Sequence, residues 1–169
     1  SKVVTGSLSG TDASNYTLSS VSTANITAKP ITGTSVDRVY DGTTNVTITY
    51  LSNIEVSDRS NVTLSGSMTN KLVGNNKTVS GVLQGSEATN YSLTSISNVN
   101  ISTKTITGTA SNKVYDSTRT ADISLNNVVL GDIVNVTGLF DTKNIASGKV
   151  VTGLLSGTDA SNYTLSSVS

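Results

Sequence analysis

The sequence contains no cysteine, no histidine and no tryptophan, and only one proline, one phenylalanine and one methionine. Without cysteine or histidine, the chain can form no disulfide, no thiolate nucleophile, no Ser–His pair and hardly any of the usual zinc sites. An enzyme of this composition would need two carboxylates facing each other in a cleft. We therefore expect no enzymatic activity and no resident cofactor.

A charge imbalance is also missing, because eleven acidic residues balance eleven basic ones. Binding a nucleic acid through its phosphates requires clustered lysine and arginine, and the sequence has no such cluster. No apolar run approaches the roughly 18 residues that a membrane-spanning helix needs. We expect neither a nucleic-acid partner nor a membrane span in these residues.

Threonine, serine, valine, asparagine and isoleucine dominate the chain. The β-branched residues favour strands, while asparagine and serine favour polar turns. Short segments of alternating apolar and polar residues end at glycine, aspartate or asparagine, as strands joined by turns do. The fold class that we predict is all-β.

One stretch of sequence organises the chain, because it occurs three times. Residues 1–22 read SKVVTGSLSGTDASNYTLSSVS, and residues 148–169 repeat them almost letter for letter. A third version lies at residues 76–97. Such repetition is typical of a tandem array, in which small units depend on contact with their neighbours.

The spacing of matching residues gives the length of one unit. Ile31 matches Ile106 and Tyr40 matches Tyr115, so the offset is 75 residues. Further along the chain the offset falls to 74 and then to 72. Because length differences collect in surface connections, the two slips predict turns near Leu51–Ser52 and near Ser65–Gly66.

This period divides the chain into three parts: the C-terminal part of a preceding repeat (1–30), a complete repeat (31–105) and a repeat that lacks its last strand (106–169). Six to eight short strands per unit of about 75 residues favour a small β-sandwich or a β-grasp-like unit. The partial repeat at the N-terminus should contain three strands, at Lys2–Leu8, Tyr16–Val21 and Ala24–Ala28.

The joints between units, Lys29–Ile31 and Lys104–Ile106, are short and do not resemble a flexible Gly/Ser linker. We therefore expect an elongated array whose units keep a fixed orientation. The predicted core is the alternating apolar set: Val39, Val46, Ile48, Ile54, Val62, Leu64, Val79, Val82, Leu83, Tyr91, Leu93 and Ile96, with Val114, Ile123, Val136, Val151, Leu154, Leu155 and Leu165 in the later copy.

Several spaced motifs resemble a known repeat. RVYDGTT at residues 38–44, the Gly131–Asp132 pair and the GTDASNY blocks ending at Tyr16 and Tyr163 together resemble the YDG-type repeat of large bacterial surface adhesins, which are filamentous-haemagglutinin-like exported proteins. The resemblance covers nearly the whole chain, although Ser117 stands where the pattern has glycine. It implies an extracellular β-rich array at the bacterial cell surface and no catalytic residue.

The motif itself falls in two predicted turns, Tyr40-Asp41-Gly42 and Tyr115-Asp116. An aromatic ring beside a carboxylate could bind a ligand. Alternatively, the aspartate accepts hydrogen bonds from local backbone N–H groups while the tyrosine packs on the sheet. We favour this structural turn, because Asp-Gly is common in turns.

The GTDASN loops and the loops near them could offer oxygens to calcium. Calcium takes six to eight oxygens, usually from several carboxylates, but each of these loops carries a single acid. We therefore favour loops without metal. The candidate ligands are Asp12, Asp58, Glu87, Asp132 and Asp159.

Three further patterns have ordinary explanations. Lys2, Lys77 and Lys149 recur at matched positions, as an internal Lys–Asn cross-link would require, but they lie near strand starts where we expect exposure. The regular T-x-T ladders of ice-binding surfaces are missing. N-x-S/T sequons arise easily in strands rich in these residues; they occur at Asn15, Asn25, Asn45, Asn61, Asn76, Asn90, Asn100, Asn135 and Asn162.

Together these observations favour a structural protein, namely stalk repeats of an extracellular bacterial adhesin that extend a binding region or contribute to biofilm fibres. Its first partners are the neighbouring repeats of the same chain. Two alternatives stay open. The end loops could recognise glycans or a host protein, or another copy could complete the unfinished repeat by adding a strand and so build a fibre.

Overall fold

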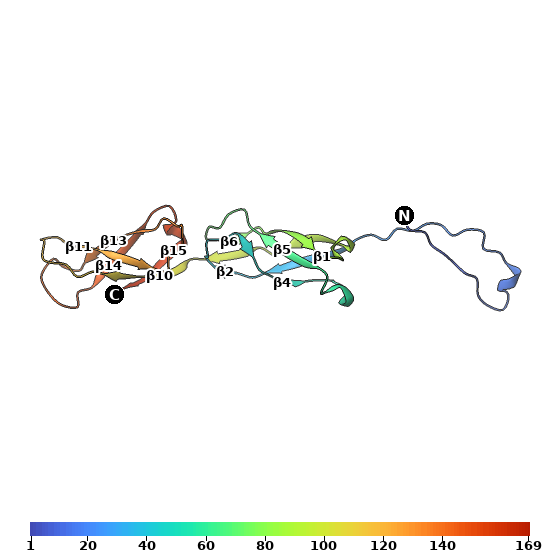
Figure 1. The fold of residues 1–169 in the computed structure, drawn as a ribbon, viewed down its shortest axis with the longest axis horizontal. Coiled ribbons are helices and arrows are strands. Elements are labelled where there is room, and N and C mark those ends of the chain that lie inside the picture. The colour runs from blue at the N-terminus through green and yellow to red at the C-terminus, as the bar shows by residue number, and fades with distance from the viewer.

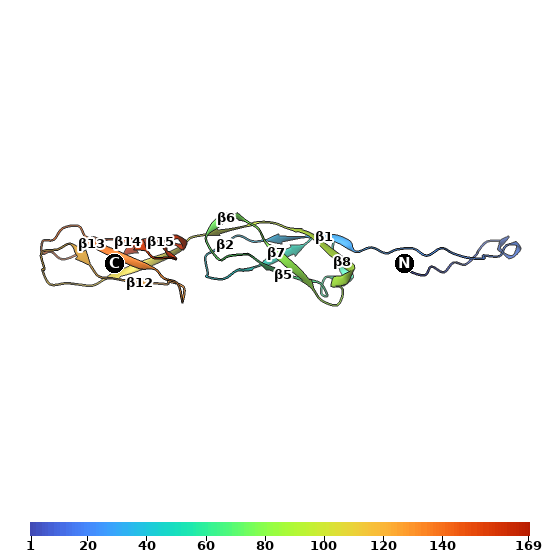
Figure 2. The same cartoon turned by 90° about the horizontal axis from the view of Figure 1, so that it is seen from above.

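The computed structural model describes residues 1–169 as an all-β chain without α-helices, which confirms the predicted fold class. Two units of related topology follow each other along one long axis, and an extended N-terminal segment continues that axis (Figure 1). The rod is thin when it is turned by 90° as well (Figure 2). The predicted elongated array is therefore present.

The first unit consists of three small sheets. Their strand orders are β4-β1-β8, β3-β5-β7 and β2-β9-β6, with β1–β8 and β2–β9 parallel and the other pairs antiparallel. The strands are β1 (Lys29–Ser35), β2 (Arg38–Val39), β3 (Asn45–Val46), β4 (Ile48–Leu51), β5 (Thr63–Ser67), β6 (Gly74–Lys77), β7 (Ser80–Gln84), β8 (Tyr91–Ile96) and β9 (Val99–Ser102), and the 3-10 turns are η2 (Val56–Asp58) and η3 (Ala88–Asn90).

The second unit repeats two of these sheets. The orders β12-β10-β15 and β11-β13-β14 match the first two sheets of the first unit. Residues 106–169 contain no counterpart of β9, so the segments that match β2 and β6 form no strand. The elements are β10 (Lys104–Ala110), β11 (Thr120–Ala121), β12 (Ile123–Asn126), β13 (Asn135–Phe140), β14 (Val151–Ser156), η4 (Ala160–Asn162) and β15 (Tyr163–Val168).

The N-terminal segment, residues 1–28, differs from the prediction. The expected strands at Lys2–Leu8, Tyr16–Val21 and Ala24–Ala28 do not form; the segment holds one β-bridge, between Lys2 and Ala24, and the 3-10 turn η1 (Ala13–Asn15). The matching stretch of the first unit, residues 76–103, forms β7, β8 and β9, which pair with β5, β1, β2 and β6. The segment has none of these partners, and a strand without a partner leaves its backbone groups unpaired.

The extra residues of the first unit do not lie at the positions that the changes in repeat offset predicted. A turn does follow Leu51, at Ser52–Asn53, but the extra residue is Thr49, because Thr34 pairs with Tyr50 while Ser35 pairs with Ile48. A β-bulge accommodates it. The predicted turn at 65–66 is wrong, since those residues lie inside β5.

The two further extra residues of the first unit are Arg59 and Ser60. Gly85 lies against the carbonyl of Asn61 in the first unit, as Gly157 lies against that of Ile133 in the second. This equivalence aligns Asn61 with Ile133 and leaves the two residues after Asp58 unmatched. A short loop beyond η2 therefore absorbs the insertion.

Buried apolar side chains form two clusters, and the larger one crosses the boundary between the units. The smaller cluster is Ile31, Ile54, Val62 and Tyr91. The larger cluster combines six side chains of the first unit with Ile106 and Tyr163 of the second; its members are Tyr40, Val46, Met68, Val79, Val99, Ile101, Ile106 and Tyr163. The units therefore share a core.

The predicted core was correct in part. Val46, Ile54, Val62, Val79 and Tyr91 are buried, but four predicted members are exposed: Val39, Val82, Val114 and Leu154. Glycine explains two of them.

In the first of these cases, a side chain on Gly81 would collide with the side chains of Ile96 and Leu64, so Gly81 occupies the inward position in β7. Strand alternation then turns Val82 outward. Gly153 places Leu154 outside in the same way.

Candidate functional site: the junction between the units

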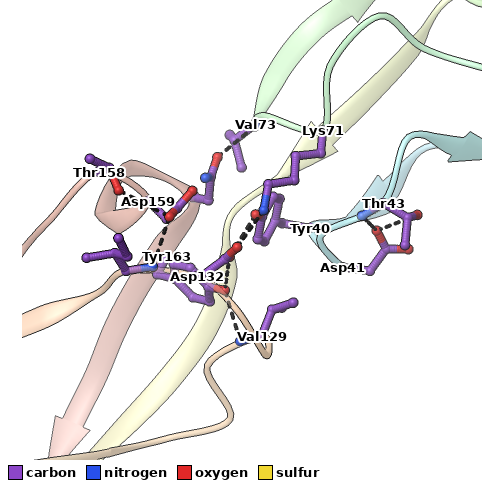
Figure 3. A network of polar contacts seen from close by, with 12 residues as sticks. Tyr40, Asp41, Thr43, Lys71, Val73, Val129, Asp132, Thr158, Asp159 and Tyr163 are labelled. Carbon is purple, nitrogen blue, oxygen red and sulfur yellow. Dashed lines mark hydrogen bonds and ion pairs between the residues drawn. The ribbon is translucent and has the colours of Figure 1, made fainter.

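A network of hydrogen-bonded polar side chains lies where the two units meet. Four side chains converge there, and we call them the junction network (Figure 3). Tyr40 follows β2 and Lys71 lies in the loop before β6, so both belong to the first unit. Asp132 precedes β13 and Tyr163 opens β15, so both belong to the second.

The carboxylate of Asp132 is the centre of the network. Its Oδ2 accepts hydrogen bonds from the Tyr40 hydroxyl at 2.7 Å and the Tyr163 hydroxyl at 2.6 Å. Its Oδ1 accepts a hydrogen bond from Lys71 Nζ at 2.5 Å. The Asp132 side chain is 1% exposed. A buried carboxylate requires such partners, and here two of the three come from the other unit.

The aromatic rings and the lysine also pack against each other. The rings of Tyr40 and Tyr163 meet edge to face, with centroids 5.5 Å apart and an interplanar angle of 76°. Lys71 Nζ lies 5.7 Å from the centroid of the Tyr40 ring. Both arrangements are attractive beyond the burial of apolar area.

Backbone groups add to the contact. The backbone N–H of Val129 donates to the Tyr163 hydroxyl at 3.0 Å, and that of Val73 donates across the junction to Asn162 Oδ1, also at 3.0 Å. Gly42 lies so close to Val129 that a Cβ on it would be 2.7 Å from Val129 Cγ1. Glycine at this turn therefore allows the close approach of the two units.

The connection between the units is itself buried. Only Thr103 separates β9 from β10. On either side of it, Ile101 is 1% exposed and Ile106 is fully buried. An extended connection held by side chains on both sides restricts bending, in agreement with the expected stiff joint.

These contacts shift the pKa values of the network. Burial raises the pKa of Tyr163 to about 12, with a further contribution from its hydrogen bond to Asp132, and the same causes raise the pKa of Tyr40. Burial alone would raise the pKa of Asp132, but hydrogen bonds from Lys71, Tyr163 and Tyr40 outweigh it and lower that pKa. The hydrogen bond to Asp132 raises the pKa of Lys71.

The aspartates of the two predicted turns act locally. Asp41 Oδ1 accepts hydrogen bonds from the N–H and the hydroxyl of Thr43 at 2.8 and 2.9 Å, and Asp41 also pairs with Arg38. Asp116 bonds Thr118 in the same way and forms an ion pair with Lys113. This is the geometry of an Asx turn. The tyrosine before each turn has a separate role.

The sequence did not reveal that role of Tyr40. We expected it to pack on its own sheet, whereas it reaches Asp132 of the next unit, 92 residues along the chain. Lys71 was not among the candidate residues, and Asn162 was considered only as a sequon and as part of a possible calcium loop. A signal existed in the repetition of Tyr40 as Tyr115, but repetition alone does not tell which residues meet across a joint.

The calcium candidates serve other contacts. Asp58 Oδ2 accepts a hydrogen bond from the Tyr91 hydroxyl at 2.7 Å, and Asp132 belongs to the junction network. Glu87 bonds Asn90, and Asp159 accepts a hydrogen bond from the backbone N–H of Ile133 at 2.9 Å. Asp12 makes no side-chain hydrogen bond to the turn η1 that it precedes. The chain brings no three acidic residues together.

The three lysines considered for a cross-link lack the asparagine and carboxyl partners that a cross-link would require. Lys77 Nζ donates to Asn70 Oδ1 at 2.6 Å, and no acidic group bonds it. Lys149 pairs with Asp141 and Thr142. Lys2 is exposed. None of the three has both an asparagine and a carboxyl group as partners.

Each half of the junction network recurs once more, at an end of the rod. We call Tyr40 with Lys71 the leading half, and Asp132 with Tyr163 the receiving half. The leading half of the second unit is Tyr115 and Lys143, and its tyrosine is 54% exposed. The receiving half of the first unit is Asp58 and Tyr91, which bond each other as Asp132 and Tyr163 do.

The comparison with protein families agrees with the two units. The family described as the YDG domain matches residues 23–98 and 100–169. The family boundaries assign most of β9 to the start of the second domain, at residue 100, which is six residues earlier than the start at residue 106 that the sequence period gave. Searches of curated proteins and of solved structures give no match. No helix of the chain has the length and apolar character to cross a bilayer.

Proposed function

Because the chain belongs to the YDG-domain family, we propose that it is a rigid spacer: consecutive stalk repeats of an extracellular bacterial adhesin that hold a binding region away from the cell surface. The observation that carries the proposal is the junction network, with the shared core around it. A spacer works only if its joints resist bending. Here the joint is buried, hydrogen-bonded and closed by side chains of both units.

The strand order also suits a protein that is pulled along its axis. The chain enters the first unit through β1 and leaves it through β9, and these strands lie parallel to β8 and β2. Each of the two strands is hydrogen-bonded on both sides, β1 to β4 and β8 and β9 to β2 and β6, so pulling either strand out of its sheet must break two ladders. This favours a load-bearing function.

The exterior suits an extended stalk in saline surroundings. The chain has no net charge, and its exposed faces are rich in threonine, serine and asparagine. Exposed ion pairs contribute little and are screened by salt. The rod should therefore keep its shape over a wide range of ionic strength.

The rigidity is tested with two spin labels, one on each unit. Since the chain has no cysteine, Ser60→Cys and Ser147→Cys, both at exposed positions, place labels at known sites. Pulsed electron paramagnetic resonance should give one narrow distance distribution. Asp132→Ala should broaden it, whereas Tyr115→Ala, at the free end, should not. A broad distribution in the unsubstituted rod would refute the spacer proposal.

The location is tested on cells of the producing organism. An antibody against this segment should label intact cells, and brief treatment with an external protease should remove the signal. Labelling that requires permeabilised cells would contradict a surface stalk, whatever the rigidity of the rod.

A further inference from the structure

The first unit has a groove of about 410 Å³, lined by β4, the start of β5 and the loop between them, which we call the β4–β5 groove. Its floor is apolar and at least partly buried; it consists of Ile48, Leu51, Ile54, Val62 and Leu64. Its rim is exposed and carries hydroxyl groups, a phenol ring and a guanidinium group; it consists of Thr49, Tyr50, Arg59 and Thr63. The volume lies within the range of about 300–1,000 Å³ that is usual for small-molecule sites.

The floor of the groove has a structural role. Ile54 and Val62 belong to the smaller core cluster, and Leu51 packs against it. The second unit keeps an apolar residue at each of these positions, namely Val128, Val134 and Leu125. Folding of the unit therefore accounts for the floor.

The rim, by contrast, belongs to the first unit alone. Thr49 and Arg59 are two of the extra residues that the second unit lacks. The counterpart of Tyr50 is Ser124, because Tyr50 pairs with Thr34 as Ser124 pairs with Thr109. The second unit forms the same two sheets without any of these rim groups, so the fold does not require them.

The rim groups are also available for a ligand. The Tyr50 side chain is 60% exposed. Arg59 is exposed and is the one charged residue that lines the groove. The acidic residues near it in the chain have other partners, since Glu55 pairs with Lys29 and Asp58 accepts a hydrogen bond from Tyr91. The groove therefore presents an uncompensated positive charge beside an aromatic ring.

A neighbouring unit leaves this place open. The internal joint shows this, because the second unit has a neighbour on the corresponding side. Ser124, at the position of Tyr50, is exposed there. Ile133 follows the point at which the first unit has its two extra residues, and it is 58% exposed. The β4–β5 groove should therefore stay accessible within a row of units.

The chemistry of the groove selects a ring that carries one negative charge. The face of the Tyr50 ring and the apolar floor suit the C–H face of a sugar. The guanidinium group of Arg59 can bind a carboxylate through two parallel hydrogen bonds. The rim threonines can donate hydrogen bonds to sugar hydroxyls and accept them. A single cation does not suit a nucleic acid, whose binding requires the neutralisation of several phosphates.

The edge beside the groove disfavours a peptide as the occupant. β4 is the outer strand of its sheet, but it is only four residues long and contains the bulge at Thr49. Short edge strands and bulges prevent a further strand from pairing. A sugar needs no such pairing.

We propose that the β4–β5 groove binds a carboxylate-bearing sugar of a polysaccharide. The ring of Tyr50 lies against the sugar ring, and Arg59 pairs with its carboxylate. The groove belongs to the first unit and not to the joint. The inference therefore goes beyond the spacer function and does not depend on it.

The first experiment is an NMR titration of the isotope-labelled chain with two acidic sugars, trigalacturonic acid and sialyllactose. The neutral counterparts are galactotriose and lactose. The backbone signals of Thr49, Tyr50 and Arg59 should shift with the acidic sugars, whereas those of Ser124 and Ile133 should not. The acidic sugars should bind more tightly than the neutral ones.

Substitutions then assign the two rim groups. Tyr50→Ser, which copies the second unit, should weaken binding about tenfold, the contribution of one well-placed aromatic ring. Arg59→Gln should leave the acidic and the neutral sugars bound equally. Tyr115→Ser is the matched control, because Tyr115 is 54% exposed but lies outside the groove, and it should bind as the unsubstituted chain does. All three positions are exposed, so the variants should keep the fold.

Several results would overturn the proposal. One is the absence of shifts at the groove with both acidic sugars, and another is binding that survives both Tyr50→Ser and Arg59→Gln. Equal binding of the neutral sugars to the unsubstituted chain would refute the role of Arg59. Equally tight binding of an acidic peptide would refute the assignment to a sugar. The spin-label distances between the units depend on neither rim group, so the two proposals fail separately.

Discussion

The internal joint and the free end of the second unit carry the same residues in opposite states. Tyr40 is 1% exposed at the joint, whereas its counterpart Tyr115 is 54% exposed at the free end. The N-terminal end of the first unit shows the same contrast: Asn162 at the joint is 1% exposed and bonds Val73 of the other unit, while its counterpart Asn90 is exposed and bonds Glu87 of its own loop. A neighbouring unit, and not the local sequence, makes the difference.

The turns behind those tyrosines do not differ. Asp41 and Asp116 hold the same hydrogen bonds to the threonine two residues on, whether or not a neighbour is present. The comparison separates two kinds of structure in one motif. The turn is complete by itself, while the tyrosine gains its surroundings only in a row of units, as expected when stability comes partly from interfaces between repeats.

The largest effect should come from Tyr40→Ala. Removing a buried aromatic side chain destabilises a protein by about 3–5 kcal/mol, and this one also loses its hydrogen bond to Asp132. Tyr115→Ala should change the free energy of unfolding by less than about 1 kcal/mol, because that ring is half exposed. Urea denaturation of both variants measures the contrast. Equal losses would mean that the joint adds nothing to the burial of the tyrosine.

Asp132→Asn should follow, with a loss of about 1–3 kcal/mol, because two tyrosine hydroxyls and Lys71 lose their charged acceptor. Asp58→Asn, the same change in the unpartnered receiving half, should have a smaller effect. Thermal unfolding of the two variants side by side measures the difference. A larger loss for Asp58→Asn would contradict the ranking.

Gly42→Ala should cost about 1–2 kcal/mol. Gly42 has a φ of +79°, which side chains disfavour, and the added Cβ would press on Val129 across the joint. Ser117, its counterpart, has a φ of +66° and no neighbouring unit. Ser117→Gly should therefore be neutral or slightly stabilising. Chemical denaturation measures the free energy of unfolding of both variants. An unchanged value for Gly42→Ala would show that the units can move apart without loss of stability.

The smallest expected effect is the change of protein stability with pH. The pKa of Asp132 lies below its ordinary 3.8, so its contribution to stability is present above that pH and is lost as the pH falls through the lowered value. The raised tyrosine pKa values act oppositely: their contribution is present below about pH 10 and is lost toward pH 12. Melting temperatures should therefore be level between these limits.

The Asp132→Asn variant sharpens this test. It should decline less than the unsubstituted chain between pH 4 and pH 3, because one of the carboxylates with a lowered pKa has been removed. An identical acid decline in the two proteins would show that the charge of Asp132 does not stabilise the joint.

The fold class, the repeat period and the chemistry of the turns could be predicted because each follows from short-range patterns. Alternation, turn residues and self-similarity are visible within a few residues or by direct comparison of the copies. Asp41 could be assigned to a turn since its partner, Thr43, is two residues away. The stiff joint followed from the absence of a linker.

The core and the junction network depend on which side chains pack against each residue in the folded chain. The local alternation of apolar and polar residues does not contain this information. Val82 was taken as core and proved exposed, since Gly81 had to face the packed side chains of Leu64 and Ile96. Ile101 was not included in the predicted core, although it is 1% exposed in β9, between β2 and β6. Tyr40 and Asp132 were not predicted to meet, because they belong to different units and lie 92 residues apart in the chain.

The assignment of β9 to the following domain sets an order of events for a chain that folds as it is synthesised, N-terminus first. Each unit has all its other strands synthesised before its closing strand appears, since that strand opens the following domain. The first unit would thus stay incomplete until residues 100–102 of its successor had emerged. Folding of each unit would therefore trail synthesis by one strand.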